Sequence, residues 1–153
     1  MTEHKDYAAV KIPPPILLLV HIFAAFILRW LLPFTFPKFL EWIGYLFVLV
    51  GLGLTFSAVS RFMQAHTTVD PHGSVNTIVT SGPYRFTRNP IYLGFVCMLI
   101  GFPFIFKTYW GLTLSPLFIV LMNTLVIQHE EAYLEKKFKD VYTSYKSRVR
   151  RWL

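Results

Sequence analysis

Four long apolar segments constrain the fold of this chain more than any other feature of its sequence. They span residues 16–32, 40–59, 91–106 and 109–127. A transmembrane helix needs about 20 apolar residues, so the second and fourth segments are long enough, the first is at the lower limit and the third is short. Only 15% of the 153 residues are charged, which leaves too little polar surface to cover four such segments in a soluble protein. We therefore predict an all-α, polytopic membrane protein with about four transmembrane helices in a single domain, residues 1–153.

The basic residues lie mostly on one side of these predicted helices. Of the 15 lysines and arginines, all except Arg29, Lys38 and Lys107 precede the first apolar segment, fall between the second and third, or follow the fourth. The positive-inside rule then places both termini and the middle loop in the cytoplasm. The net charge of +7 is expected to attract anionic membrane lipids rather than nucleic acid, for which the sequence has no motif.

A stiff cationic turn, SGPYRFTRNPIYLG at residues 81–94, leads from the middle loop into the third segment. The loop before it holds a turn signal at residues 70–73 and a short β-like run, NTIVTSGPY, that ends in Gly-Pro. Pro90 suits the first turn of a helix, where its missing N–H costs nothing. Gly94 would let another group approach the helix backbone closely.

Two adjacent carboxylates, Glu130 and Glu131, stand where the fourth segment ends. The tail from His129 onward predicts an amphipathic helix, because its apolar residues recur every three or four positions. These residues are Leu134, Phe138, Val141, Tyr142, Tyr145 and Val149. A short turn joins the third and fourth segments, so we expect an antiparallel hairpin that brings residues 88–92 next to the glutamates. Arginine, glutamate and tyrosine together suit a zwitterion with a sugar and a base, such as S-adenosylmethionine or a nucleotide.

The segment NTIVTSGPYRFTRNPIYLG (76–94), followed by EEAYLEKKFKDVYTSYKSRV (130–149), resembles the isoprenylcysteine carboxyl methyltransferase family. It is also similar to the related phospholipid N-methyltransferases, and the likeness covers residues 76–149. The resemblance implies an S-adenosylmethionine-dependent methyltransferase that acts at the cytoplasmic face of the membrane. Its substrate would be lipophilic: a phospholipid amine, a prenylcysteine-like carboxylate or another lipid.

By position, the resemblance implies that the cofactor contacts the loop before the third segment, the start of that segment and the glutamate pair. These positions are Asn76, Thr77, Ile78, Val79, Tyr84, Asn89, Pro90, Ile91, Tyr92, Glu130 and Glu131. Arg88 joins them as a residue expected to support the turn or to pair with one of the glutamates. No catalytic residue is assigned. No metal site is expected, because His66 and His72 have no further ligands at metal-binding spacing.

Three positions bear on how closely the chain follows these families. The Gly-Leu-Gly at residues 51–53 resembles a cofactor-binding Gly-x-Gly of the phospholipid methyltransferases, although glycines also crowd membrane helices for packing. Asn89 stands where many members have histidine, and its amide has no titratable imidazole to act as a general base. Val126 stands where carboxyl-methylating members tend to carry arginine, which argues against a prenylcysteine substrate. Arg148 or Arg150 in the tail could reach in instead, although no sequence feature indicates it.

Two other functions remain open at this point. A nicotinamide-dependent membrane reductase would share a similar C-terminal domain with the sterol reductases, but those chains have more transmembrane segments than 153 residues can hold. A non-catalytic membrane scaffold would keep the fold without turnover. Binding of S-adenosylhomocysteine or of NADPH would separate the three functions.

Overall fold

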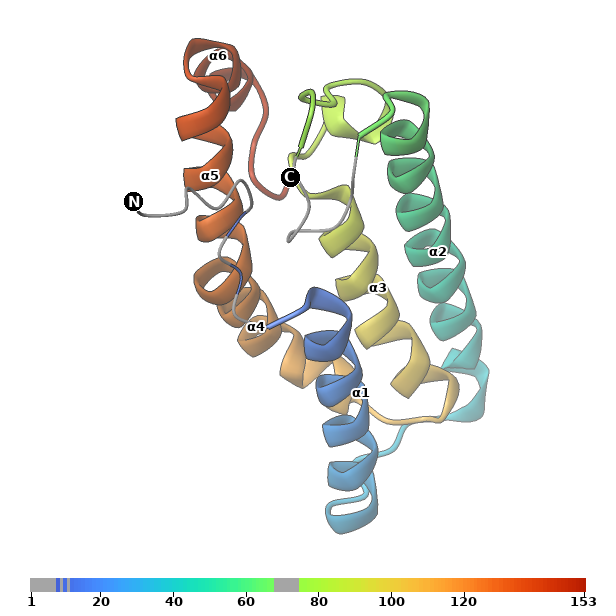
Figure 1. Ribbon diagram of the computed structural model, residues 1–153. Coiled ribbons are helices and arrows are strands. Elements are labelled where there is room, and N and C mark those ends of the chain that lie inside the picture. The colour runs from blue at the N-terminus through green and yellow to red at the C-terminus, as the bar shows by residue number, and fades with distance from the viewer. Residues whose placement is uncertain (1–7, 9, 11, 68–74) are drawn as a thin grey trace.

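The structure, a computed structural model, describes residues 8, 10, 12–67 and 75–153. Long helices run side by side and a shorter one follows at one end (Figure 1). The helices are α1 (Pro14–Leu31), α2 (Glu41–Gln64), α3 (Pro90–Ile105), α4 (Trp110–Met122), α5 (Gln128–Phe138) and α6 (Asp140–Arg148). The described residues contain no strand, and their β-type pairing is limited to an isolated bridge between Thr35 and Thr108. The predicted all-α class is confirmed.

The β-like run predicted before the third segment is wrong. Residues 75–80 have no regular secondary structure, and Gly82–Arg85 forms a 3₁₀ turn. The turn begins at Gly82, whose φ of 62° is a conformation that residues with a Cβ rarely adopt. An extended run needs a partner strand, and the described part of the chain offers none. The turn signal at residues 70–73, His72, Lys5 and Lys11 lie outside the described residues.

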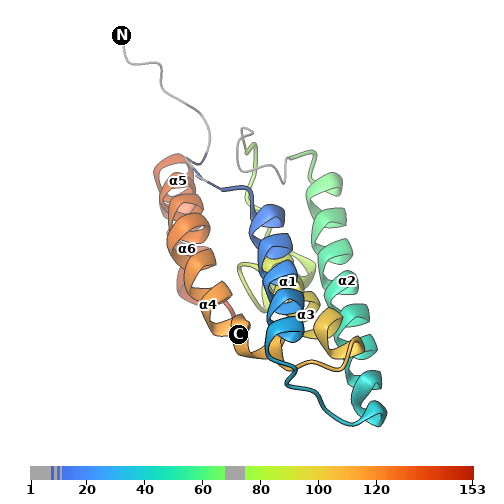
Figure 2. The ribbon, with the colours of Figure 1, turned by 90° about the horizontal axis from the view of Figure 1, so that it is seen from below.

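Three helical stretches have the length and composition to cross a membrane: Pro14–Leu31, Lys38–Gln64 and Trp110–Phe138. The apolar helix α3 is shorter, with 16 residues, as its sequence segment predicts. In both views it lies between α2 on one side and the α4–α5 helix on the other (Figures 1 and 2). The outer helices expose large apolar side chains, such as Phe56 of α2 at 78% exposure, which suits contact with lipid. The prediction of a polytopic helical membrane protein is confirmed.

Helix α3 packs against α2 through bare backbone at two levels. A Cβ atom added at Gly51 would lie 2.7 Å from the Gly94 carbonyl oxygen. Two turns further along, a Cβ at Gly101 would lie 2.8 Å from the Gly44 carbonyl oxygen. Small residues let membrane helices approach this closely and gain van der Waals contact. The close approach expected at Gly94 is therefore made by α2.

The two connections at the other end of the bundle contact each other. Thr35, between α1 and α2, pairs with Thr108, between α3 and α4. The Trp110 indole Nε1 donates to the Leu32 carbonyl over 2.8 Å. These contacts fix the far ends of the helices relative to one another.

The fourth helix continues past the predicted end of its apolar segment. It runs from Trp110 through a π-helical segment, Asn123–Ile127, into α5 and stops at Phe138. Neither proline nor glycine occurs between residues 117 and 138, and the residues that follow Ile127 are compatible with helix. The predicted C-terminal helix thus consists of two pieces, α5 and α6, separated by Lys139 with a φ of 46°. This break lets α6 turn back over the start of α3.

Candidate functional site

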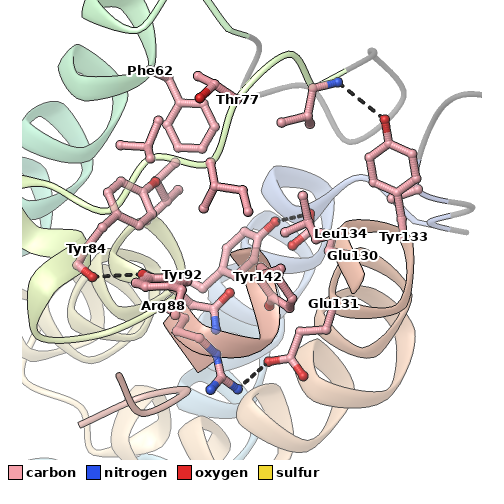
Figure 3. A pocket seen from close by; sticks show the side chains of 17 residues that line it. Phe62, Thr77, Tyr84, Arg88, Tyr92, Glu130, Glu131, Tyr133, Leu134 and Tyr142 are labelled. Atoms are coloured by element: carbon pink, nitrogen blue, oxygen red, sulfur yellow. Dashed lines mark hydrogen bonds and ion pairs between the residues drawn. The ribbon is translucent and has the colours of Figure 1, made fainter. Parts of the chain in front are cut away.

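A pocket lies at the end of the bundle where α3 begins, bounded by the loop before α3 and by α2, α5 and α6 (Figure 3). Most of the residues predicted to contact a cofactor line this one pocket. They are Thr77, Ile78, Val79, Tyr84, Arg88, Asn89, Ile91, Tyr92, Glu130 and Glu131. The fold thus brings the two separate sequence blocks together, as the expected hairpin of the third and fourth segments requires.

Two of the predicted residues do not line the pocket. Asn76 is exposed, and its backbone N–H donates to the Thr67 hydroxyl over 3.0 Å. Pro90 is fully buried in the first turn of α3, directly after the N-cap residue Asn89. Its place confirms the predicted helix start, and it acts on the pocket only by setting the direction of α3.

Several pocket residues were missed by the sequence analysis, and most of these are aromatic. They are Phe62 from α2, Tyr133 and Leu134 from α5, Tyr142 and Tyr145 from α6, and Ala8 and Val75. The spacing of Leu134, Tyr142 and Tyr145 did indicate a buried helix face. The pattern could not show that this face covers a pocket, because the break at Lys139 redirects α6.

Tyrosine hydroxyls form much of the polar surface on the α6 side. The Tyr145 hydroxyl donates to the Tyr84 carbonyl oxygen over 2.7 Å and so ties α6 to the loop before α3. Burial raises the pKa of Tyr145 to about 12. Burial also raises the pKa of Tyr84 and of Tyr142. All three hydroxyls therefore stay protonated at neutral pH and can donate hydrogen bonds.

Glu130 faces the pocket beside Tyr92. The Tyr92 hydroxyl donates to Glu130 Oε1 over 2.5 Å (Figure 3). Among the described residues, no lysine or arginine forms an ion pair with this carboxylate. No described cation therefore competes with a ligand for the Glu130 carboxylate.

Glu131, the next residue, has the opposite environment. It is buried, and Arg88 Nη2 lies 2.6 Å from its Oε1. Arg151 donates from Nε to Oε1 over 3.0 Å and from Nη2 to Oε2 over 2.7 Å. Lys146 Nζ lies 3.8 Å from Oε2. The hydrogen bonds to Glu131 raise the pKa of Arg151, so this ion-pair network is charged at any physiological pH.

Arg88 also holds the end of the chain in place. Its Nη1 donates to the carbonyl oxygens of Lys146 and Val149 over 3.1 and 2.9 Å. Its backbone N–H donates to the Arg150 carbonyl oxygen over 2.9 Å. Of the two expectations for Arg88, the pairing with a glutamate is met, and the partner is Glu131. The other hydrogen bonds of Arg88 join the start of α3 to residues 146–150.

The side chain of Asn89 is used for the same purpose. Its Nδ2 donates to the Arg151 carbonyl oxygen over 2.9 Å, and the Thr87 hydroxyl donates to the same oxygen over 3.0 Å. Asn89 thus binds the segment after α6, residues 149–153, which is called the tail from here on. The Asn89 amide serves as a hydrogen-bond donor to backbone, a role that needs no titratable imidazole. The tail arginine that reaches the site is Arg151. The sequence candidates Arg148 and Arg150 do not: Arg148 Nε donates to the Ser144 carbonyl oxygen on its own helix, and only the backbone of Arg150 takes part.

The remaining positions that were compared with the families, Gly51, Gly53 and Val126, do not line the pocket. Gly51 is used in the contact between α2 and α3, and a Cβ at Gly53 would meet nothing within 4 Å. Val126 is fully buried in the apolar core.

The chain is similar in sequence to known methyltransferases. A family model described as "Phospholipid methyltransferase" matches residues 39–141. The chain is 29% identical over 105 residues to "Protein-S-isoprenylcysteine O-methyltransferase" of Schizosaccharomyces pombe, a match that covers 67% of this chain and 44% of that protein. It is 54% identical over 37 residues to an uncharacterized protein of Haemophilus influenzae, covering 24% of this chain and 59% of that protein. The chain spans about half the length of the curated relatives it matches. No solved structure matches it.

Proposed function

The chain belongs to the phospholipid methyltransferase family, and we propose that it transfers the methyl group of S-adenosylmethionine to a lipophilic acceptor at the membrane surface. The observation that carries this proposal is the pairing of Tyr92 with Glu130 inside a pocket rich in tyrosine. Such a pocket suits a ligand that carries positive charge.

The described residues fit the cofactor. S-adenosylmethionine has a sulfonium and an ammonium group, and both are stabilised by a carboxylate and by aromatic faces. Glu130 supplies the carboxylate without a competing cation, and Tyr84, Tyr92 and Tyr142 supply the rings and hydroxyls. Loop residues 77–79 form an apolar wall against which a base or a sugar can pack.

For methyl transfer, the main task of the protein is to position the methyl donor and the acceptor relative to each other. When bound, the cofactor supplies an electrophilic methyl group, so correct alignment of a nucleophile provides much of the rate. Glu130 and Tyr92 would orient the cofactor, and the buried Arg88–Glu131 pair would keep the wall of the pocket rigid. We assign no general base.

Two observations favour an amine or a neutral acceptor over a prenylcysteine-like carboxylate. A carboxylate substrate calls for a cation in the site, yet Arg88, which lines the pocket, and Arg151, which lies beside it, already bind Glu131. Val126, in the position where an arginine was expected, is buried and apolar. The acceptor would enter from the bilayer with its lipid tail. The cofactor would enter from the cytoplasm, on which side the positive-inside rule places both termini.

Ligand binding by the purified protein tests the proposal. We expect S-adenosylhomocysteine to bind in the micromolar range and NADPH not to bind. Incubation with labelled S-adenosylmethionine and a lipid extract should then place the label in a lipid product. Binding of NADPH alone would indicate a reductase, and binding of neither ligand would indicate a scaffold.

A further inference from the structure

We propose that Arg151 sets the preference of the pocket between the methyl donor, with its sulfonium, and the product, in which a neutral thioether replaces it. Together with Arg88, Arg151 neutralises Glu131 and leaves Glu130 as the one carboxylate that acts on the ligand. This inference rests on the proposed function. It concerns a residue of the tail that lies outside both sequence blocks and does not itself line the pocket.

The first step is the charge around Glu131. Glu131 lines the pocket, and each of its oxygens accepts a hydrogen bond from an arginine. Arg151 contacts both oxygens, at 3.0 and 2.7 Å, and Arg88 contacts Oε1 at 2.6 Å. Lys146 is more distant, at 3.8 Å, and lies 2.5 Å from Glu135, which takes up its charge. Without Arg151, one guanidinium would remain against two adjacent carboxylates.

The second step is that the backbone holds Arg151 independently of its side chain. The Arg151 carbonyl oxygen accepts hydrogen bonds from Thr87 and Asn89 at 3.0 and 2.9 Å. The next residue, Trp152, donates from its indole Nε1 to Asn123 Oδ1 over 3.1 Å. Replacement of the Arg151 side chain leaves all three contacts in place. A change of charge at this position can therefore be separated from loss of the docked tail.

The third step is the charge change in the reaction. The donor carries a sulfonium, and the product, S-adenosylhomocysteine, carries a neutral thioether in its place. A fixed charge near the pocket therefore acts differently on donor and product, whereas general damage to the pocket weakens both. Removal of the positive charge of Arg151 should favour the donor, and removal of the negative charge of Glu131 should favour the product.

The experiment compares dissociation constants for S-adenosylmethionine, its stable cationic analogue sinefungin, and S-adenosylhomocysteine. The variants are Arg151→Gln, Arg151→Lys, Glu131→Gln and the double variant Glu131→Gln/Arg151→Gln. Arg148→Gln is the matched control, because it removes the same charge from an exposed side chain that bonds only its own helix. Thermal unfolding confirms that each variant is folded at the temperature of measurement.

We expect Arg151→Gln to raise the preference for the two cationic ligands over S-adenosylhomocysteine by about three- to tenfold, given the interaction of unit charges over several ångströms at a partly screened site. Glu131→Gln should lower this preference. The double variant, Arg151→Lys and Arg148→Gln should stay within about twofold of the wild type.

Parallel losses of affinity for all three ligands in Arg151→Gln, with the preference unchanged, would show a purely structural role and overturn the inference while leaving the proposed function intact. A shift of the same sign in Arg151→Gln and Glu131→Gln would also overturn it. Failure of the wild type to bind any of the three ligands would instead overturn the proposed function, and this inference with it.

Discussion

Two of the contacts that helix α3 makes have opposite character. Their difference separates a region that stabilises the fold from a region that can bind a ligand. Against α2 it presents bare glycine backbone, so that the contact is close and involves no charged side chain. Against α5 and the tail its first turn and preceding loop present Arg88, Asn89 and Tyr92, which bind glutamates and backbone carbonyls. The first contact can only hold the helices together. The second leaves Glu130 unpaired by any described cation and so can receive a ligand.

The largest effect is expected from a substitution that disrupts the close contact between α2 and α3. Gly51→Leu should prevent folding, because a Cβ there would already lie 2.7 Å from the Gly94 carbonyl oxygen, on a backbone that cannot move aside. Gly53→Leu is the matched control, since a Cβ there would meet nothing within 4 Å. Thermal unfolding in detergent micelles, together with the yield of folded protein, measures both variants. Equal tolerance of the two leucines would show that α2 and α3 are not packed as described. Loss of cofactor binding in folded Gly53→Leu would instead return Gly53 to the candidate site.

The next largest effect is expected from a substitution that removes the ion pair between Arg88 and Glu131. Arg88→Ala should destabilise the protein by about 3–5 kcal/mol, because it leaves the buried Glu131 with one of its two arginine partners. Arg85, three residues earlier and exposed, provides the comparison: Arg85→Ala should change stability by no more than about 0.5 kcal/mol. Both are read from the midpoint of thermal unfolding. Equal, mild effects would mean that both arginines only contact lipid phosphates.

A smaller effect is expected from a substitution at the hydrogen bond between Tyr92 and Glu130, which faces the pocket. Tyr92→Phe removes the hydrogen bond to Glu130, at a cost of about 1.5–3 kcal/mol for a bond to a charged acceptor. We expect this loss in stability or in affinity for S-adenosylhomocysteine, measured by thermal unfolding and by calorimetry. Tyr45→Phe, on the exposed side of α2, should change neither. A Tyr92→Phe variant that matches the wild type in both would remove Tyr92 from the site.

The helices and their packing were largely predictable from the sequence. Long apolar segments have few alternatives to membrane helices, and Asn89-Pro90 marks a helix start through local chemistry alone. The approach to Gly94 was expected, although its partner was not. The residues of α3 and α5 that meet in the pocket were predicted because a short turn between two apolar segments forces their other ends together.

The polar contacts were predictable only in part. Arg88 could have paired with either glutamate, and the choice of Glu131 depends on where the tail runs. The chain changes direction at Lys139, which has a positive φ. Glycine or asparagine would have marked such a position in the sequence, but lysine does not. Arg151 lies 20 residues from Glu131 in the sequence and beyond a break in the helix, so no spacing rule connects them. Tertiary geometry alone distinguishes it from Arg148 and Arg150.

The central claim is that two adjacent carboxylates have separate tasks, and a direct comparison of Glu130→Gln with Glu131→Gln tests it. The measurement is the Kd for S-adenosylhomocysteine by calorimetry, with the thermal midpoint of each variant measured in the same detergent. Glu130→Gln should weaken binding by about ten- to a hundredfold, the equivalent of about 1.5–3 kcal/mol, because the amide cannot hold a cationic group as the carboxylate does. Its thermal midpoint should stay within about 3 °C of the wild type. Glu131→Gln should lower the midpoint much further, because it leaves Arg88 and Arg151 without their shared anion. Unchanged binding in Glu130→Gln, or equal losses of stability in both variants, would contradict the account.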